Sequence, residues 1–202
     1  MNKGQLRAHF KALLNRSDCE DALADTFIDQ SITRIQRTLR IPPMEKTQTY
    51  TIAGATSYLM LPSDFLEIID LYHDNTNLER VPLSKLIEFS EPEEGGTPKY
   101  FCREGEHLLI YPRPSTGSVK MNYYGQFPDL TDDASSNDLT TLASDLVTYG
   151  ALSYAADYYL DERGQLFEGR FAQFMFELQD QANEAELAGT VQRMQPTATY
   201  SE

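Results

Sequence analysis

The stretch ASDLVTYGALSYAADYYLDE, residues 143–162, decides the fold because it predicts a helix with almost no polar face. A surface helix normally carries polar residues over about half of its circumference. Here the polar residues Asp145, Ser153 and Asp157 share one narrow stripe at helical spacing, while aromatic, aliphatic and small residues cover the rest. We therefore expect this helix to be covered on nearly all sides, either at the centre of its own domain or against another chain.

A second long helix is predicted after Gly164, which we expect to mark the break between the two helices. Between residues 165 and 187, apolar residues recur at a spacing that makes one continuous stripe. The stripe contains Phe167, Phe171, Phe174, Met175, Leu178 and Ala182. Beyond Gly189 the helical period disappears and Pro196 interrupts the chain, so the end is predicted to be an extended tail.

Two amphipathic helices are predicted near the start of the chain. Residues 5–14 and residues 19–39 both repeat apolar side chains at helical spacing. Ser17 or Asp18 can cap the second of them. The sequence IPP at 41–43 ends it, because proline lacks an amide hydrogen and biases the preceding residue away from the helix.

The middle of the chain has a different period, with alternating residues and short apolar runs bounded by turn-forming residues. A short helix is expected at 83–89, and strands are expected at 100–103, 107–111 and 119–126. Such alternation is typical of an antiparallel sheet and not of βαβ units. The predicted fold class is α+β, mainly α: a helical bundle with an inserted small antiparallel β-lobe and an extended C-terminal tail.

The order of these elements divides the chain into four parts. The parts are 1–43, the N-terminal helices of the bundle; 44–128, the inserted β-lobe; 129–189, the long C-terminal helices of the bundle; and 190–202, the extended tail. The linker PDLTDDASSND at 128–138 returns the chain to helices, and Ser136, Asn137 or Asp138 can cap the next one.

The charge distribution bears on possible partners. The net charge of −14 argues against a protein that wraps nucleic acid, because affinity for phosphates comes mainly from clustered lysine and arginine. Between residues 129 and 186 there are thirteen carboxylates and two cations, Arg163 and Arg170. Two interpretations stay open: a solvated helical surface, or a negative surface that repels DNA moving past it.

Cysteines and hydrophobic runs indicate the compartment. Cys19 and Cys102 fit no CxxC or zinc spacing, which favours two unpaired thiols in a reducing compartment. The start of the chain has no apolar core of a signal peptide, and no run approaches the ~18 apolar residues of a membrane span. We expect a cytosolic product with no membrane segment.

The motifs of catalytic and cofactor sites are missing from the sequence. The three histidines, His9, His73 and His107, lie in different predicted elements, and no metal or cofactor is expected. Paired carboxylates could serve a cell-wall hydrolase, but a chain with 31 acidic residues offers many pairs by chance.

Five motifs, in order, resemble the head-to-tail adaptor, or connector, proteins of tailed bacteriophages. They are LPSDFLEIIDLY (61–72), GTPKYF (96–101), LLIYPRP (108–114), YYGQFPDLTDD (123–133) and DLVTYGALSYAADYYLDE (145–162). The resemblance covers the chain from about residue 61 to about residue 189. One departure is Leu139, where the family pattern has a tryptophan.

The resemblance implies a structural protein of the virion and no enzymatic activity. It implies a portal-binding ring of twelve subunits in the neck, at the head-tail interface, which extends the DNA channel and docks the tail nozzle or other tail proteins. Genomic DNA would pass through the lumen during ejection without specific binding.

Two sets of residues are candidates for these contacts. The resemblance implies that the C-terminal tail contacts the portal, through Val191, Arg193, Met194, Pro196 and Tyr200. Stiff aromatic side chains bury large areas, so those of the two long helices are expected at subunit or bundle interfaces. They are Tyr149, Tyr154, Tyr158, Tyr159, Phe167, Phe171 and Phe174.

Two alternatives remain. One is another phage neck or tail ring protein, a nozzle or a terminator, although a nozzle would be expected to be richer in strands. The other is a carboxylate-dependent cell-wall hydrolase.

Overall fold

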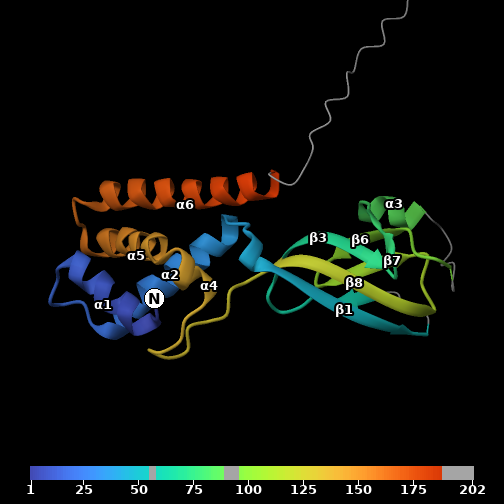
Figure 1. The fold of residues 1–202 in the computed structure, drawn as a ribbon, viewed down its shortest axis with the longest axis horizontal. Helices are drawn as coiled ribbons and strands as arrows, with labels where there is room; N and C mark the ends of the chain where they lie inside the picture. Colours follow the sequence, from blue (N-terminus) through green and yellow to red (C-terminus); the bar gives the residue numbers. More distant parts are fainter. Residues whose placement is uncertain (55–57, 89–95, 188–202) are drawn as a thin grey trace, which may run out of the picture. The chain divides into compact units, whose positions relative to one another are not determined.

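The computed structural model describes residues 1–54, 58–88 and 96–187 (Figure 1). Its internal contacts divide the chain into two compact units. The helical unit comprises Gln5–Ile41 and Ala143–Glu202, and the β unit comprises Met1–Gly4 and Pro42–Leu142. The mainly α, α+β class is confirmed. The division into four functional parts stays a prediction.

The helical unit is built around the stretch quoted first, which forms helix α5, Ser144–Tyr159. α5 packs against α2, Asp21–Thr38, and against α6, Gly164–Leu187, which runs alongside it in Figure 1. Side chains on most of its circumference are buried, including Leu146 and Leu152, which have no exposed surface. The predicted covering of α5 is therefore provided largely by its own unit.

Helix α1, Lys3–Leu14, buries Leu6, Phe10 and Leu14 completely. Helix α2 begins after Glu20 and has no side-chain cap, so neither Ser17 nor Asp18 caps it as predicted. Asp18 instead forms an ion pair with Arg16, with 2.9 Å between Oδ2 and Nη2.

The approach of α2 to α5 depends on a glycine. Ser31 of α2 is fully buried, and its Oγ donates a hydrogen bond of 2.9 Å to the carbonyl oxygen of Val147. A Cβ atom on Gly150 would lie 2.2 Å from Ser31 Oγ and 3.0 Å from the ring of Phe171. Only glycine lets the two helices and the α6 phenylalanine meet at this point.

The break between the long helices lies earlier than predicted. The chain leaves α5 at Leu160, whose φ of 54° is left-handed and whose amide donates to the carbonyl oxygens of Ala156 and Asp157. Gly164 is the first residue of α6 and not the break itself. Sequence reasoning missed this because the left-handed cap of a helix is usually a glycine.

The β unit contains two four-stranded sheets. The first has the order β1 (Glu45–Ala53), β8 (Thr116–Gly125), β3 (Phe65–His73) and β4 (Thr76–Asn77). The second has the order β2 (Tyr58–Met60), β7 (His107–Tyr111), β6 (Tyr100–Glu104) and β5 (Glu79–Arg80). Leu71 and Met121 of the first sheet and Leu108 of the second belong to one buried cluster.

One strand pair departs from the expected antiparallel pattern. β5 pairs with β6 in parallel, and the other pairs are antiparallel. The chain between β5 and β6 contains helix α3, Leu83–Glu88, and a parallel pair requires such a crossover connection.

The linker after β8 ends at helix α4, Asp138–Leu142. Of the three candidate caps, Asn137 is the one used, because its Oδ1 accepts a hydrogen bond of 2.9 Å from the amide of Thr140. Leu139, where the resemblance leads us to expect a tryptophan, is fully buried.

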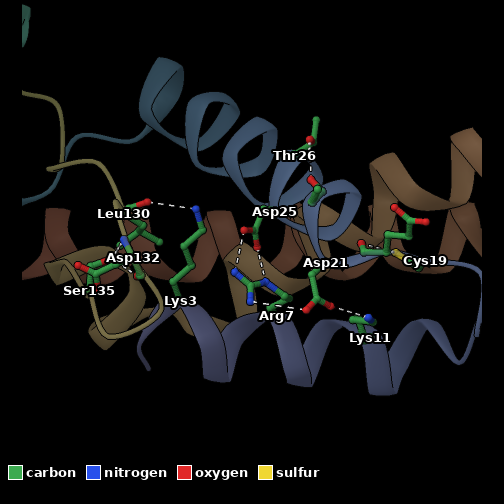
Figure 2. Close-up of polar contacts among 12 residues, drawn as sticks. Lys3, Arg7, Lys11, Cys19, Asp21, Asp25, Thr26, Leu130, Asp132 and Ser135 are labelled. Carbon is green, nitrogen blue, oxygen red and sulfur yellow. Dashed lines mark hydrogen bonds and ion pairs between the residues drawn. The ribbon is translucent and has the colours of Figure 1, made fainter.

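The linker also binds the start of α1. The amide of Lys3 donates to the carbonyl oxygen of Ser135, and the amide of Gly4 donates to that of Asp133, at 2.9 and 3.0 Å. The Lys3 ammonium group donates to the carbonyl oxygen of Leu130 at 3.1 Å, which Figure 2 shows. These carbonyl groups satisfy amides of the first helical turn, which have no partner within the helix.

Candidate interaction surfaces of the helical unit

The seven aromatic residues predicted at interfaces divide into three groups by exposure. Phe167 and Phe171 are 6% and 4% exposed and belong to the core of the bundle. Phe167 lies 6.2 Å from Tyr149, measured between ring centroids, and Phe174 lies 5.5 Å from the same tyrosine. These contacts fix α6 on α5.

Tyr149, Tyr154, Tyr159 and Phe174 are half-buried. The guanidinium group of Arg16 lies 4.1 Å from the ring centroid of Tyr159. Burial, with the Cys19 thiol beside the hydroxyl group, raises the pKa of Tyr159 to about 12. Tyr159 is therefore neutral at physiological pH and acts as a packing residue.

Tyr158 is the one member of the seven that is mostly exposed, at 62%. Its ring makes edge contacts with Phe27 and Tyr159, at centroid distances of 5.7 and 4.8 Å. These neighbours hold the exposed ring in one orientation, so it can contact another chain without much loss of side-chain entropy.

Sequence reasoning missed three exposed apolar residues of this unit. Leu160 is 89% exposed, Leu166 is 58% exposed and Phe176 is 69% exposed. Phe176 could have been found, because it follows Phe167 by nine residues and so lies on the opposite side of the helix from the apolar stripe. The exposure of Leu160 could not have been predicted, because the sequence pattern indicates a helix that continues through this residue.

A network of polar groups joins the three long helices. The guanidinium group of Arg34 on α2 donates two hydrogen bonds to Glu168 on α6, one of 2.9 Å to Oε2 and a shorter one to Oε1. Ser153 on α5 donates a third, of 2.6 Å, to Oε2. The Arg34 hydrogen bonds lower the pKa of Glu168 below its usual value, so the carboxylate stays ionised.

A second set of ion pairs joins α1 to α2 (Figure 2). Arg7 contacts both carboxylate oxygens of Asp25, at 2.6 and 2.7 Å. Lys11 donates to Asp21 at 2.6 Å. Arg7 and Lys11 are thus used in contacts between the first two helices.

Two of the hollows that the described residues form on the surface of the helical unit involve α6. One, of 540 Å³, lies between α2 and α6, and the other, of 710 Å³, lies at the turn between α5 and α6. The first is lined by Arg34, Arg37, Thr38, Glu168, Phe171, Ala172, Met175, Phe176 and Gln179. The second is lined by Ser153, Tyr154, Ala156, Asp157, Leu160, Asp161, Glu162, Gly164, Gln165 and Glu168.

The acidic residues of the long helices lie mainly on the surface. Asp145, Asp157, Glu177, Asp180 and Glu184 are all exposed. This arrangement suits a solvated surface and a DNA-repelling surface equally, so both interpretations remain.

The described residues contain no group of three or more histidine, cysteine or acidic side chains that could hold a metal ion. His73 Nε2 lies 3.1 Å from the carbonyl oxygen of Thr116, and His107 packs edge-on against Tyr58. Cys19 and Cys102 are free and buried. Within the same part of the chain, no helix is long and apolar enough to cross a membrane.

The predicted portal-binding residues lie outside the described residues. They are Val191, Arg193, Met194, Pro196 and Tyr200. Their role stays a prediction.

Comparison with known proteins supports the resemblance found in the sequence. No curated protein matches the chain. A family model described as SU10 adaptor protein matches residues 1–196, which is nearly the whole chain. This match confirms the resemblance to phage head-to-tail adaptors, and the chain belongs to the SU10 adaptor protein family.

Proposed function

We propose that the protein is a structural component of the phage neck that forms a ring of twelve subunits beneath the portal. The ring extends the DNA channel and docks the nozzle or other tail proteins. The observation that carries this proposal is the exposure of large apolar side chains at two separate places on one helical unit, Tyr158 with Leu160 and, on α6, Phe176. A heterologous ring contact buries two different faces of every subunit.

In this proposal the bundle of residues 1–43 and 129–189 forms the body of the ring. Residues 44–128 form a lobe available to tail proteins, and residues 190–202 bind the portal. The polar and apolar residues of the tail, among them Arg193, Met194 and Tyr200, suit a segment that binds along a partner.

The acidic surface supports passage of DNA through the ring. Exposed carboxylates such as Asp145, Asp157 and Asp180 repel phosphates, so DNA would slide past without binding. We propose that part of this surface faces the lumen.

The test is to mix the purified full chain with the portal of the same phage and to image the mixture by electron microscopy. A second ring stacked coaxially on the portal is the expected result. Bare portals at saturating protein would refute the proposal. A chain lacking residues 191–202 is the matched control, and we expect it to fold normally and to leave the portal bare. Full binding by the shortened chain would refute the role of the tail only.

A further inference from the structure

The turn between α5 and α6 presents a leucine at an unfavourable backbone position. Leu160 has φ of 54°, a conformation that costs residues with a side chain free energy and that glycine normally occupies at the end of a helix. Its side chain is also 89% exposed, so no packing within the subunit compensates. A leucine held outward in this way is suited to bind a hydrophobic hollow on another molecule.

The surroundings of Leu160 are apolar and mainly acidic, and the cation of the turn, Arg163, is paired with Asp161. Tyr158 and Leu166 are exposed beside the turn, and Asp157 and Glu162 line the same hollow as Leu160. Within the part of the chain that the structure describes, neither of these two carboxylates has a cationic partner. We call residues 157–166 the elbow.

The hollow between α2 and α6 has the complementary character. Phe176 and Met175 line it from α6, and Arg37 lines it from α2. Arg34, in the same hollow, is already paired with Glu168. Arg37 is exposed and forms no ion pair among the described residues. We call this hollow the α2–α6 groove.

Leu160 cannot reach Phe176 of its own subunit, although Glu168 lines both hollows. Both features lie along α6, the elbow at its first residues and Phe176 twelve residues further on. At a rise of 1.5 Å per residue, the helix separates them by about 18 Å. Leu160 and Phe176 can therefore meet only between different molecules.

We propose that the elbow of one copy docks into the α2–α6 groove of a second copy. Leu160 packs on Phe176 and Met175, and Glu162 pairs with Arg37. The contact is head-to-tail, because it joins two different patches, and such contacts generate closed rings or filaments. The inference rests on the proposed ring and identifies the residues that join its subunits.

We expect the groove to bind a second copy of this chain, because the elbow matches the groove in apolar character and has the opposite charge. The chain has 31 acidic and 17 basic residues, so a second copy offers the exposed Arg37 more carboxylates than competing cations. Another copy also supplies the exposed Leu160 with the exposed carboxylate of Glu162 two residues away.

The first experiment joins two singly substituted copies by a short bismaleimide. One copy carries Gln165→Cys, in the elbow, and the other carries Ala172→Cys, in the groove, so Leu160 and Phe176 keep their side chains. The natural Cys19 and Cys102 are buried and react little. Ile69→Cys, an exposed apolar position on β3, replaces the first copy in the control. The reaction is run on the concentrated free protein and on the mixture with the portal.

A covalent heterodimer from the Gln165→Cys and Ala172→Cys copies, and none from the control, is the expected result in either condition. A ring on the portal without this cross-link would overturn the inference and leave the adaptor function intact. The cross-link in free protein, with portals that stay bare, would uphold the inference and overturn the adaptor function. No cross-link in either condition would overturn the inference.

The second experiment exchanges the charges. Arg37→Glu on the groove copy and Glu162→Arg on the elbow copy are each expected to lower the cross-linking rate about tenfold, and the two together are expected to restore it. Thermal unfolding of each variant checks that the surface substitutions leave the fold intact. A rate unchanged by either single substitution, or not restored by the pair, would overturn the Glu162–Arg37 assignment.

Discussion

Replacing Gly150 with alanine adds one methyl group where α2, α5 and α6 meet. The new Cβ would lie 2.2 Å from Ser31 Oγ, which is shorter than a carbon atom tolerates, and 3.0 Å from Phe171, which is a tight contact. Overpacking of a buried site costs about 1–3 kcal/mol. Displacing Ser31 from the carbonyl of Val147 costs about 1 kcal/mol more, because that hydrogen bond is fully buried.

One effect opposes this loss. Alanine is about 1 kcal/mol more favourable than glycine inside a helix. The net expectation for Gly150→Ala is therefore a loss of about 1–3 kcal/mol in the free energy of unfolding. Urea unfolding, followed by far-ultraviolet circular dichroism, measures it.

Gly169→Ala is the matched control. Gly169 is exposed on α6, and no atom lies within 4 Å of an added Cβ, so only the helix preference acts and the variant should gain up to about 1 kcal/mol. Adding Ser31→Ala to Gly150→Ala should recover part of the loss, since it removes the nearest atom. If Gly150→Ala were as stable as Gly169→Ala, the argument for close helix approach would be wrong.

Three further predictions concern the helix ends and the polar network. Leu160→Gly should raise the free energy of unfolding by about 1 kcal/mol, because glycine relieves the strain of the left-handed backbone, and it should weaken assembly. Thermal unfolding measures the first effect and cross-linking the second, and a destabilised variant would show that the backbone is not strained. Glu168→Gln should cost about 1 kcal/mol near neutral pH. Arg34 lowers the pKa of Glu168 in the folded protein below the ordinary value of 4.5. The ion pair therefore stabilises the fold above pH 4.5, and this stabilisation is lost as the pH falls through the folded pKa. The difference from the parent, measured by urea unfolding at a series of pH values, should thus shrink in acid, and a constant difference would exclude the ionic contribution. Asn137→Ala should lose about 1–2 kcal/mol, because it removes the cap of α4, whereas Ser136→Ala should be nearly neutral; equal losses in urea unfolding would show that Asn137 is not the cap.

The sequence was most informative where side chains repeat at a regular interval. The periods of the long helices and of the late strands predicted those elements to within a few residues, because burial of one face requires that spacing. The order of helices, strands and helices followed directly. Residues whose role depends on a distant partner were not accessible in this way: nothing local shows that Gly150 must face Ser31.

The interaction surfaces were predicted less completely, for a related reason. Aromatic content alone could not distinguish Phe167 and Phe171, which are buried in the bundle, from Tyr158, which is exposed. The exposure of Leu160 depends on one left-handed residue, and amino-acid type gives almost no signal for that conformation in leucine. Similarly, the parallel pairing of β5 with β6 was not predicted, because β5 has only two residues and shows no sequence pattern of a strand.

The attachment of α1 to the linker has a consequence for the order in which the chain folds. The amides of Lys3 and Gly4 donate to the carbonyl oxygens of Ser135 and Asp133. The first turn of α1 therefore lacks these acceptors until about 130 more residues have been synthesised. The two sheets draw only on residues 45–125 and can form in the meantime. Such distant pairing slows folding. We expect α1 and α2 to pair early, and their contacts with the linker and with α5 to form last, when those residues have been synthesised.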